Sequence, residues 1–550
     1  MKLLLTISIT LLSLPAFSVV DMKNASFVDV WTDLTVPGTG YDLKIRRGYK
    51  SRSLFNGMFG FGWCSDFETK IEITPEGNLK LTECGAGLEI VYTPRDFSPA
   101  EIEKTVSQII GEHKKEHSEL DKNFYTDFEK KLKTNIDLRT HYAQTYKIKI
   151  SLKSGTVFYA NGKEIEHITF NNNIYTRYLG DSTEQKFNTD GSIVFMSDRN
   201  GNHLKFSYDK DNMLRQVVDN GGRTLSFKYD PISKKVKEIV GPHNLSASYK
   251  FSGQDLIHVK NAWNNIYAFS YDDLHNLLRI NFPDNTYKQL TYDQDKDWVT
   301  SFRARNGCTE KYTYNPQEDD PKNHYISQVV KSCQGKVVTQ ASYEFWHKKR
   351  DDGESYLARV RSSYGSETTD VVYHAVFGRP TSLGRNGHYI QFTYFDNGLV
   401  KTKEFDQTKI YYEYKNKFNK VSRVVTIVFD KKGKVTSRQS SEFDYNNRAN
   451  LTSAKNSAGQ TVAISYDKHG RIAVIEDQAK RVVKIQYDEK LGKPIWVERV
   501  GVGSITVSYN AAGEIKEATS KDGPTVANQI YSAFNSLLEI INPATEEMAL

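Results

Sequence analysis

Short runs of alternating apolar and polar residues fill most of this chain. Leu204, Phe206 and Tyr208, for example, alternate with polar neighbours. This period of two predicts a strand with one buried face. A polar turn at residues 209–212 and a second predicted strand at 214–218 follow. The segment therefore predicts one antiparallel hairpin.

The hairpin pattern returns about every 21 residues, and the first strand of each copy ends in an aromatic residue. Successive anchors from Phe187 to Tyr314 are 21, 21, 20, 22, 21 and 22 residues apart. A fixed period of this length is typical of repeat architectures. Six copies keep a complete Tyr-Asp pair: Tyr208 with Asp209, Tyr229 with Asp230, Tyr271 with Asp272, Tyr292 with Asp293, Tyr466 with Asp467, and Tyr487 with Asp488.

The position of the pair at a strand end suggests its role. Tyrosine can bury its ring while its hydroxyl bonds a neighbouring hairpin, and aspartate can accept hydrogen bonds from the amides of the turn that follows. Equivalent residues recur along the whole array, and they cannot all be active sites. We interpret the pairs as structural anchors of the repeat.

The repeat resembles a known family. Residues 198–209 fit the pattern Asp-x-x-Gly-x-x-Φ-x-Φ-x-Tyr-Asp in full, which is similar to the RHS or YD-repeat family of bacterial polymorphic toxins, toxin-complex shells and teneurins. A second similarity lies upstream, where an Arg-x-Tyr-x-Ser-Arg run at 47–52 precedes the Gly-x-Gly-Trp turn at 60–63. Together the two similarities cover most of residues 30–95 and 146–515.

The resemblance implies an all-β fold in which repeated antiparallel hairpins form a spiralling YD-repeat shell or a partial shell. Shells of relatives are longer, and in the toxin branch they end in an Asp-Pro-x-Gly core followed by a toxic domain. Neither feature is found in this sequence. We therefore expect residues 526–550 to be a C-terminal segment and not a toxin domain.

One stretch breaks the repeat and predicts helices. Ser98 is a suitable N-cap, Pro99 suits the first helical position, and Glu101 lies three residues after the cap. Ile102 and Val106 then begin an apolar stripe with helical spacing. We expect two helical segments here, which elaborate the family pattern and are a place to look for specific function.

These patterns predict the following organisation: a signal peptide at 1–18, an RHS-like β entry domain at 19–97, a helical insertion at 98–140, a YD-repeat β-shell at 141–525, and a C-terminal segment at 526–550.

The first residues predict export. Lys2 precedes an apolar stretch from Leu3 to Leu14, and Ala16 to Ser18 resembles a cleavage site. No other apolar run approaches the ~20 residues needed to cross a membrane. We therefore expect a periplasmic, cell-surface or extracellular protein without a transmembrane segment.

The charges are balanced, with 74 basic and 67 acidic residues intermixed along the chain. This pattern has no basic stripe for nucleic acid. Long loops, such as the one at 316–321, are further candidate binding sites because binding residues concentrate in loops.

The chain has four cysteines, Cys64, Cys84, Cys308 and Cys333. An even number in an exported protein is compatible with disulfides, and three pairings are open. The local pairing, Cys64 with Cys84 and Cys308 with Cys333, suits neighbouring hairpins. Free buried thiols are the alternative.

Catalytic motifs are weak. His113, Glu116 and His117 match the H-x-x-E-H pattern of inverted zinc peptidases, but they lie in a helix crowded with charge, and a solvated helix face explains them better. The run at 293–297 starts like a calcium loop, yet Trp298 stands where glycine is required. We expect no catalytic residues, no metal and no cofactor, and we predict that the chain is not an enzyme.

The leading hypothesis is therefore a non-catalytic scaffold that binds or encloses a cell-surface glycan, an envelope protein or a cargo polypeptide. One alternative is a shell that carries a separately encoded toxin, and a second is a glycan-processing enzyme. The sequence leaves the partner, the closure of the shell and the oligomeric state open.

Overall fold

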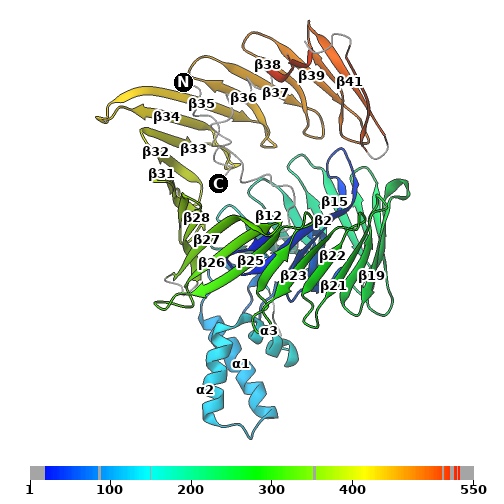
Figure 1. Cartoon of the computed structure of the whole chain (residues 1–550), viewed down its shortest axis with the longest axis vertical. Helices are drawn as coiled ribbons and strands as arrows, with labels where there is room; N and C mark the ends of the chain where they lie inside the picture. Colours follow the sequence, from blue (N-terminus) through cyan, green and yellow to red (C-terminus); the bar gives the residue numbers. More distant parts are fainter. Residues whose placement is uncertain are drawn as a thin grey trace. The chain divides into compact units, whose positions relative to one another are not determined.

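The computed structural model describes residues 19–83, 88–148, 150, 152–350, 355–510, 513–520, 526–528 and 530–532 (Figure 1). Two compact units are formed, one by residues 1–65 with 197–550 and the other by residues 66–196. The predicted signal peptide at 1–18 lies outside the described residues. In the part of the chain that is described, no helix is both long and apolar enough to cross a membrane.

The larger unit is dominated by one antiparallel meander in which each strand pairs with the next, from β15 to β42. The predicted all-β fold of repeated antiparallel hairpins is thereby confirmed. The strands of its first half are β15 (His203–Tyr208), β16 (Leu214–Asp219), β17 (Thr224–Tyr229), β18 (Val236–Val240), β19 (Ser246–Ser252), β20 (Asp255–Lys260), β21 (Ile266–Tyr271), β22 (Leu277–Asn281), β23 (Tyr287–Tyr292), β24 (Val299–Arg303), β25 (Thr309–Pro316), β26 (His324–Cys333), β27 (Lys336–Lys349) and β28 (Ser355–Tyr364).

A short 3-10 helix, η2 (Pro242–Asn244), forms the connection between the paired strands β18 and β19 of the first half. The second half continues the meander in the same way. Its strands are β29 (Glu367–Tyr373), β30 (Pro380–Arg385), β31 (His388–Tyr394), β32 (Val400–Phe405), β33 (Thr408–Glu413), β34 (Arg423–Phe429), β35 (Val435–Tyr445), β36 (Leu451–Asn456), β37 (Thr461–Tyr466), β38 (Ile472–Asp477), β39 (Val482–Tyr487), β40 (Pro494–Arg499), β41 (Gly503–Tyr509) and β42 (Ile515–Ser520).

Short strands such as β37 bury one apolar face. In β37, Val462 and Ile464 are buried while Ala463 and Ser465 are exposed, as the alternation predicts. Successive strands align these apolar side chains across the meander, because pairing register fixes which face each residue occupies.

A separate N-terminal sheet belongs to the same unit. It has the order β1 (Val19–Asp21), β2 (Ser26–Val36), β3 (Leu43–Lys50) and β6 (Trp63–Ser65), and a small pair, β4 (Asn56–Gly57) with β5 (Gly60–Phe61), joins β3 to β6. Backbone hydrogen bonds attach it to the repeats: the Val236 amide donates to the Met58 carbonyl at 2.9 Å, the Ala262 amide to Asp33 at 2.8 Å, and the Val299 amide to Ala25 at 3.0 Å.

The meander also contacts its own beginning. The Asn202 side-chain amide donates to the His469 carbonyl at 3.0 Å, and the Asn450 amide donates to the Asn200 side chain at 2.7 Å. A Cβ added at Gly492 would lie 2.1 Å from the Gly38 carbonyl oxygen, so the loop at residue 38 lies directly against this turn. We call these contacts of the turns around residues 450, 470 and 492 the seam.

The smaller unit holds a short antiparallel sheet and the helices. Its pairing runs through β7, β8, β9, β10, β11, β12 and β13. Its strands and 3-10 helix are η1 (Asp66–Glu68), β7 (Lys70–Ile73), β8 (Leu79–Glu83), β9 (Leu88–Pro94), β10 (Thr156–Tyr159), β11 (His167–Asn171), β12 (Ile174–Tyr178), β13 (Glu184–Phe187) and β14 (Ile193–Ser197), the last of which ends at the boundary between the units.

The helical insertion has three helices, α1 (Ala100–Glu116), α2 (Lys122–Thr134) and α3 (Ile136–Thr145), where the pattern predicted two segments. Asp121 caps α2 by accepting from the Phe124 amide at 2.8 Å, and Asn135 caps α3 by accepting from the Leu138 amide at 2.9 Å. Such caps stabilise helix starts by about 1 kcal/mol. The Asn135 cap is the local signal for the third helix that the apolar spacing did not reveal.

The seam can be tested with two glycines of similar backbone conformation. Gly492 (φ +66°) and Gly459 (φ +83°) both strain an alanine, at a cost of about 1 to 2 kcal/mol. Nothing lies within 4 Å of a Cβ at Gly459, whereas a Cβ at Gly492 meets the Gly38 backbone. We expect Gly492→Ala to lower the urea midpoint clearly more than Gly459→Ala. Equal losses would show that the seam does not form in solution.

Candidate binding face and its cavity

The tyrosines of the Tyr-Asp pairs bond the hairpin that precedes them. The Tyr292 hydroxyl donates to the Leu277 carbonyl at 3.1 Å, and the Tyr466 hydroxyl donates to the Leu451 carbonyl at 2.7 Å. Each acceptor lies 15 residues before its tyrosine. The same bond is made by Tyr229, Tyr271, Tyr314, Tyr487 and Tyr509. Tyr208 occupies the corresponding strand end in β15.

Sequence reasoning missed a bulge that explains this bond. The pairing register shifts at Tyr466, which faces Ile472 on the next strand. The Ile472 carbonyl then accepts the hydroxyl of Tyr487 at 2.8 Å, and in the same way Leu451 faces Tyr445 and accepts from Tyr466. A bulge disrupts ladder hydrogen bonding locally. The tyrosine hydroxyl of one hairpin therefore donates to the backbone carbonyl that faces the bulge of the preceding hairpin.

The aspartates hold the turns. Asp209 accepts from the amides of Asp211 at 2.9 Å and Met213 at 3.0 Å, and Asp272 and Asp467 make the same pair of bonds. Asp230, Asp293 and Asp488 bond the second and third residues after them. The Ser233 amide, followed by the Ser233 hydroxyl, lowers the pKa of Asp230 below its usual range. These carboxylates serve turns of the Asx type.

The N-terminal sheet anchors the repeats through a buried ion pair. The Arg47 Nε lies 2.6 Å from the Asp33 carboxylate, and both side chains are buried. The Tyr249 hydroxyl, on β19, donates to the same carboxylate at 3.1 Å. A buried charge must be paired to be tolerated, so this contact ties the sheet to one position on the repeats.

Aromatic residues of the entry motif complete the anchor. The Arg47 guanidinium lies 4.2 Å from the centre of the Trp63 ring, and the Trp63 indole donates to the Tyr271 hydroxyl at 2.9 Å. The Leu277 amide donates to the Tyr49 hydroxyl at 2.9 Å. Burial raises the pKa of both Tyr49 and Tyr271 well above the usual value, so these hydroxyls stay protonated. The residues that carry the upstream resemblance therefore bond the repeats directly.

Beside this anchor lies a cavity of about 630 Å³, lined by β2 and by the repeats from β22 to β26. We call it the inner cavity. Trp31 stacks on Phe282 with ring centres 5.6 Å apart, and the Arg305 guanidinium lies 4.0 Å from the Phe282 ring. Lys288 pairs with Asp29 at 2.9 Å. Burial raises the pKa of Asp29, and Lys288 opposes that shift.

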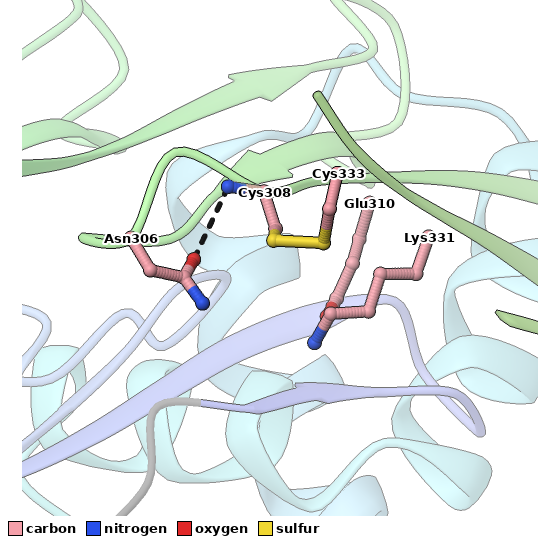
Figure 2. Close-up of a disulfide and its surroundings, with 5 residues drawn as sticks. All are labelled: Asn306, Cys308, Glu310, Lys331 and Cys333. Carbon is pink, nitrogen blue, oxygen red and sulfur yellow. Dashed lines mark hydrogen bonds and ion pairs between the residues drawn. A yellow bond between two sulfur atoms is a disulfide. The ribbon is translucent and has the colours of Figure 1, made fainter. Parts of the chain in front are cut away.

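Figure 2 shows the disulfide Cys308–Cys333 beside three residues that line the inner cavity, and we call this edge of the cavity the rim. The disulfide joins the turn before β25 to the end of β26. Asn306, Glu310 and Lys331, which line the cavity, surround it, and Lys331 lies 3.0 Å from Glu310. Asn306 accepts from the Cys308 amide at 3.1 Å. The rim is thus held covalently, and the charged side chains of the cavity are already engaged with protein groups. Such walls suit binding through aromatic and polar contacts.

Only one cysteine of the other predicted pair lies within the described residues. Cys64 lies in β6, whereas Cys84 lies outside the described residues. The pairing of Cys64 with Cys84 stays a prediction.

The residues of the zinc-peptidase pattern are not arranged as ligands of one ion. His113 is buried between the helices, where its Nδ1 lies 3.2 Å from the Tyr125 hydroxyl and its ring lies 4.8 Å from that of Phe128. Glu116 is exposed. Among the described residues, no group of three or more His, Cys, Asp or Glu side chains could hold a metal. His113 was expected on a solvated face, but it belongs to the core of the helical insertion.

The calcium-like run at 293–297 forms an ordinary repeat turn. Asp293 bonds the amides of Asp295 and Lys296, and Asp297 accepts from the Asn276 side chain at 3.0 Å. The Asp293 carboxylate therefore serves this turn, and the Asp297 carboxylate bonds the preceding repeat turn.

Residues 18–92 match a family described as a domain of unknown function (DUF6531). No curated protein matches the chain.

Two solved structures are similar over most of the chain. A crystal structure of TcdB2-TccC3-TEV is 11% identical with a TM-score of 0.42, and the match covers 92% of this chain and 28% of that one. The Photorhabdus luminescens Tc holotoxin pore is 11% identical with a TM-score of 0.37, and that match covers 90% of this chain and 28% of the other. The chain spans little more than a quarter of the length of these proteins.

The tyrosine bond predicts a measurable stability difference. Tyr466→Phe keeps the ring and removes the donor to the Leu451 carbonyl, so we expect a loss of about 1 kcal/mol in unfolding free energy. Tyr364→Phe is the matched control, because that tyrosine is 57% exposed. Urea denaturation of both variants measures the difference. If Tyr466→Phe were as stable as the control, the hydroxyl would not support the repeat.

The buried histidine predicts a pH dependence in the helical insertion. Burial, and then repulsion from His117, lowers the pKa of His113, while Glu116 and Glu119 oppose the shift. The unfolded chain then binds the proton more readily, so helix stability falls as the pH drops below about 6.5. Thermal melts followed by the helical circular-dichroism signal, between about pH 7.5 and about pH 5.5, measure this.

His113→Gln should flatten that pH dependence, whatever its effect on the melting temperature itself. His141→Gln, at an exposed position of α3, should leave the pH dependence as in the wild type. If His113→Gln kept the pH dependence of the wild type, the loss of helix stability at low pH would be caused by another titrating group.

Proposed function

We propose that this chain is an exported, non-catalytic scaffold that encloses or holds a polypeptide partner. The observation that carries the proposal is the seam, where the hairpin array of the larger unit meets its own beginning. Asn200 and Asn202 bond Asn450 and His469, which follow about 250 residues later. A β-array that contacts its own start has a continuous wall, and a continuous wall is what enclosure requires.

The N-terminal sheet supports an enclosing role. It is attached to the repeats by the buried Arg47–Asp33 pair and by the Trp63–Tyr271 hydrogen bond. The inner cavity lies beside it, with Trp31 and Phe282 in its wall. Aromatic residues are enriched where proteins bind other proteins. We assign this face of the repeats to contact with the partner.

The absence of a catalytic role is also part of the proposal. The charged groups that line the inner cavity pair with other protein groups: Asp29 with Lys288, Glu310 with Lys331, and Arg305 with Asp284. A catalytic base or nucleophile has to reach the substrate with its reactive atom. Side chains that are held in ion pairs with protein groups stabilise the fold and are poorly placed to react with a substrate.

The disulfide supports export. Cys308 and Cys333 are bonded, and disulfides persist in oxidising compartments such as the periplasm or the extracellular space. Together with the signal-like residues 1–18, the disulfide supports a location outside the cytoplasm for the proposed scaffold.

A capture experiment tests the proposal. Tagged protein of residues 19–550 is incubated with the envelope fraction and culture medium of its native host, and captured material is identified by mass spectrometry. We expect one enriched polypeptide that is protected from protease while bound. Gly492→Glu should open the seam against Gly38 and release it, whereas Gly459→Glu, which meets no atom within 4 Å, should retain it.

The outcomes separate the alternatives. A captured toxic polypeptide encoded separately would identify the chain as a toxin carrier. Enrichment of polysaccharide without protein, or equal capture by the Gly492→Glu and Gly459→Glu variants, would overturn enclosure of a polypeptide. Turnover of a captured glycan would establish the enzyme alternative instead.

A further inference from the structure

A second cavity lies where the turn between β1 and β2 meets the repeats from β24 to β26. It measures about 290 Å³, and we call it the outer-turn cavity. The residues used in the argument are Lys23, Arg52, Trp298, Tyr314, Lys322 and Tyr325, all of which line it. It includes the end of the long loop at 316–321, which the sequence marks as a candidate binding loop. It shares no lining residue with the inner cavity.

The walls of this cavity are held in place by hydrogen bonds across it. The Tyr325 hydroxyl donates to the Lys23 carbonyl at 2.6 Å, and the Val299 amide donates to the Ala25 carbonyl at 3.0 Å. The Arg52 guanidinium donates to the Asn24 carbonyl. These bonds fix the turn at residues 23–25 against the repeats, so the site is preorganised. Preorganisation reduces the entropy lost on binding.

Aromatic rings form the apolar part of the cavity. Trp298 and Tyr314 meet edge to face with centres 5.2 Å apart, and Tyr325 stacks on Phe345 at 5.1 Å. The hydroxyls of Tyr314 and Tyr325 are committed to the carbonyls of Val299 and Lys23. The ring surfaces, and not the hydroxyls, are therefore what a ligand would meet.

The cavity has an excess of cations. Within the described part of the chain, Lys23, Arg52 and Lys322 have no carboxylate within ion-pair distance, and no acidic residue lines the cavity. The acidic residues of the adjoining loop are engaged elsewhere: Asp319 pairs with His324 at 2.9 Å, and Asp320 accepts from the Asn323 side chain at 3.1 Å. Asp21 lies nearby, and with burial it raises the pKa of Tyr325 to about 12.

The surrounding strands argue against a bound peptide. β24, β25 and β26 are each paired on both sides, so no free strand edge borders the cavity to accept an added strand. A helix docks through anchors spread over several turns, which a cavity of about 290 Å³ cannot hold. A proline-rich peptide would leave the three cations without a partner. The remaining ligand is small, anionic, and flat or apolar on one side.

We propose that the outer-turn cavity binds one acidic sugar unit, a uronate, of a polysaccharide. The Trp298 and Tyr314 rings stand edge to face, and Lys296 lies 4.7 Å from the centre of the Trp298 ring, so the C–H face of the pyranose would lie on one ring and meet the edge of the other. The carboxylate would be held by Lys322, Lys23 and Arg52. Guanidinium and ammonium groups form strong charge-assisted hydrogen bonds with carboxylates. The site would attach the scaffold to an acidic surface polymer, and it is independent of any polypeptide held at the inner cavity.

Titration of the purified chain of residues 19–550 with an oligogalacturonate tests this assignment. Binding is followed by calorimetry and by tryptophan fluorescence, to which Trp298 contributes. We expect the methyl-esterified oligomer to bind at least about tenfold more weakly, since its carboxylates are neutral. Because the measurement needs no partner protein, its result is separate from that of the capture experiment.

Two charge reversals provide the matched comparison. Lys322→Glu should weaken binding by about tenfold, whereas Lys432→Glu, which reverses the charge of an exposed lysine in another repeat turn, should change it by less than about twofold. Trp298→Phe should retain measurable binding, and Trp298→Ala should lose it while a circular-dichroism spectrum confirms the fold.

Three results would overturn the proposal. The first is no binding of the acidic oligomer by the wild type. The second is equal loss in Lys322→Glu and Lys432→Glu, which would indicate unspecific attraction to the net positive charge. The third is preferential binding of an acidic phosphopeptide over the oligogalacturonate, which would assign the cavity to protein recognition.

Discussion

The backbone at the bulges is the constraint on which the repeat array depends. Each bulge interrupts the regular pairing of two strands, and the carbonyl opposite it accepts the hydroxyl of the next tyrosine, as Leu451 accepts from Tyr466 and Ile472 from Tyr487. The backbone carbonyl at the bulge of a hairpin is therefore hydrogen-bonded only after the next hairpin has folded against it. The separation of 15 residues between donor and acceptor, together with the turn that follows, accounts for a period that varies by only one or two residues. Between β26 and β28 the strands are longer, and the register shifts fall at Ser332 and His347, away from Tyr343, so these hairpins depart from the pattern.

The N-terminal sheet adds contacts of a different kind. The hydroxyl bonds are local, whereas Arg47, Asp33 and Tyr249 join segments more than 200 residues apart in sequence. A pair of charges inside a protein is stable only in one geometry, because a displaced partner leaves a buried charge alone. Arg47 therefore selects one register of the sheet on the repeats. The entry motif and the repeat motif are two halves of one contact surface.

The sequence predicted the fold well where the physics is local. Alternation in segments such as 204–208 predicted the hairpins, and the strand-end position of tyrosine suggested the bond to a neighbour. The bulges were not predicted, because a bulge is defined by how two strands pair. The alternation along a single strand does not show where one strand has a residue more than its partner. The third helix was missed because the apolar stripe after Ile136 is weak and only the Asn135 cap marks it. His113 was misplaced because the charged residues around it were given more weight than its spacing: it lies four residues after Ile109 and seven after Val106, on the apolar stripe of α1. The cavities, built from segments far apart in sequence, had no local signal beyond the long loop at 316–321.

The direction of the tyrosine bonds has a consequence for biogenesis. In the repeats each acceptor carbonyl precedes its donor in the chain, so each new hairpin finds its partner already made as the polypeptide is synthesised from its N-terminus. Folding can then advance one hairpin at a time, at the pace of synthesis, with little unpaired strand exposed to aggregation. The N-terminal sheet is the exception, since Asp33 and Trp63 must wait for Tyr249 and Tyr271 to arrive. Until then its apolar face is the surface that a chaperone would have to protect.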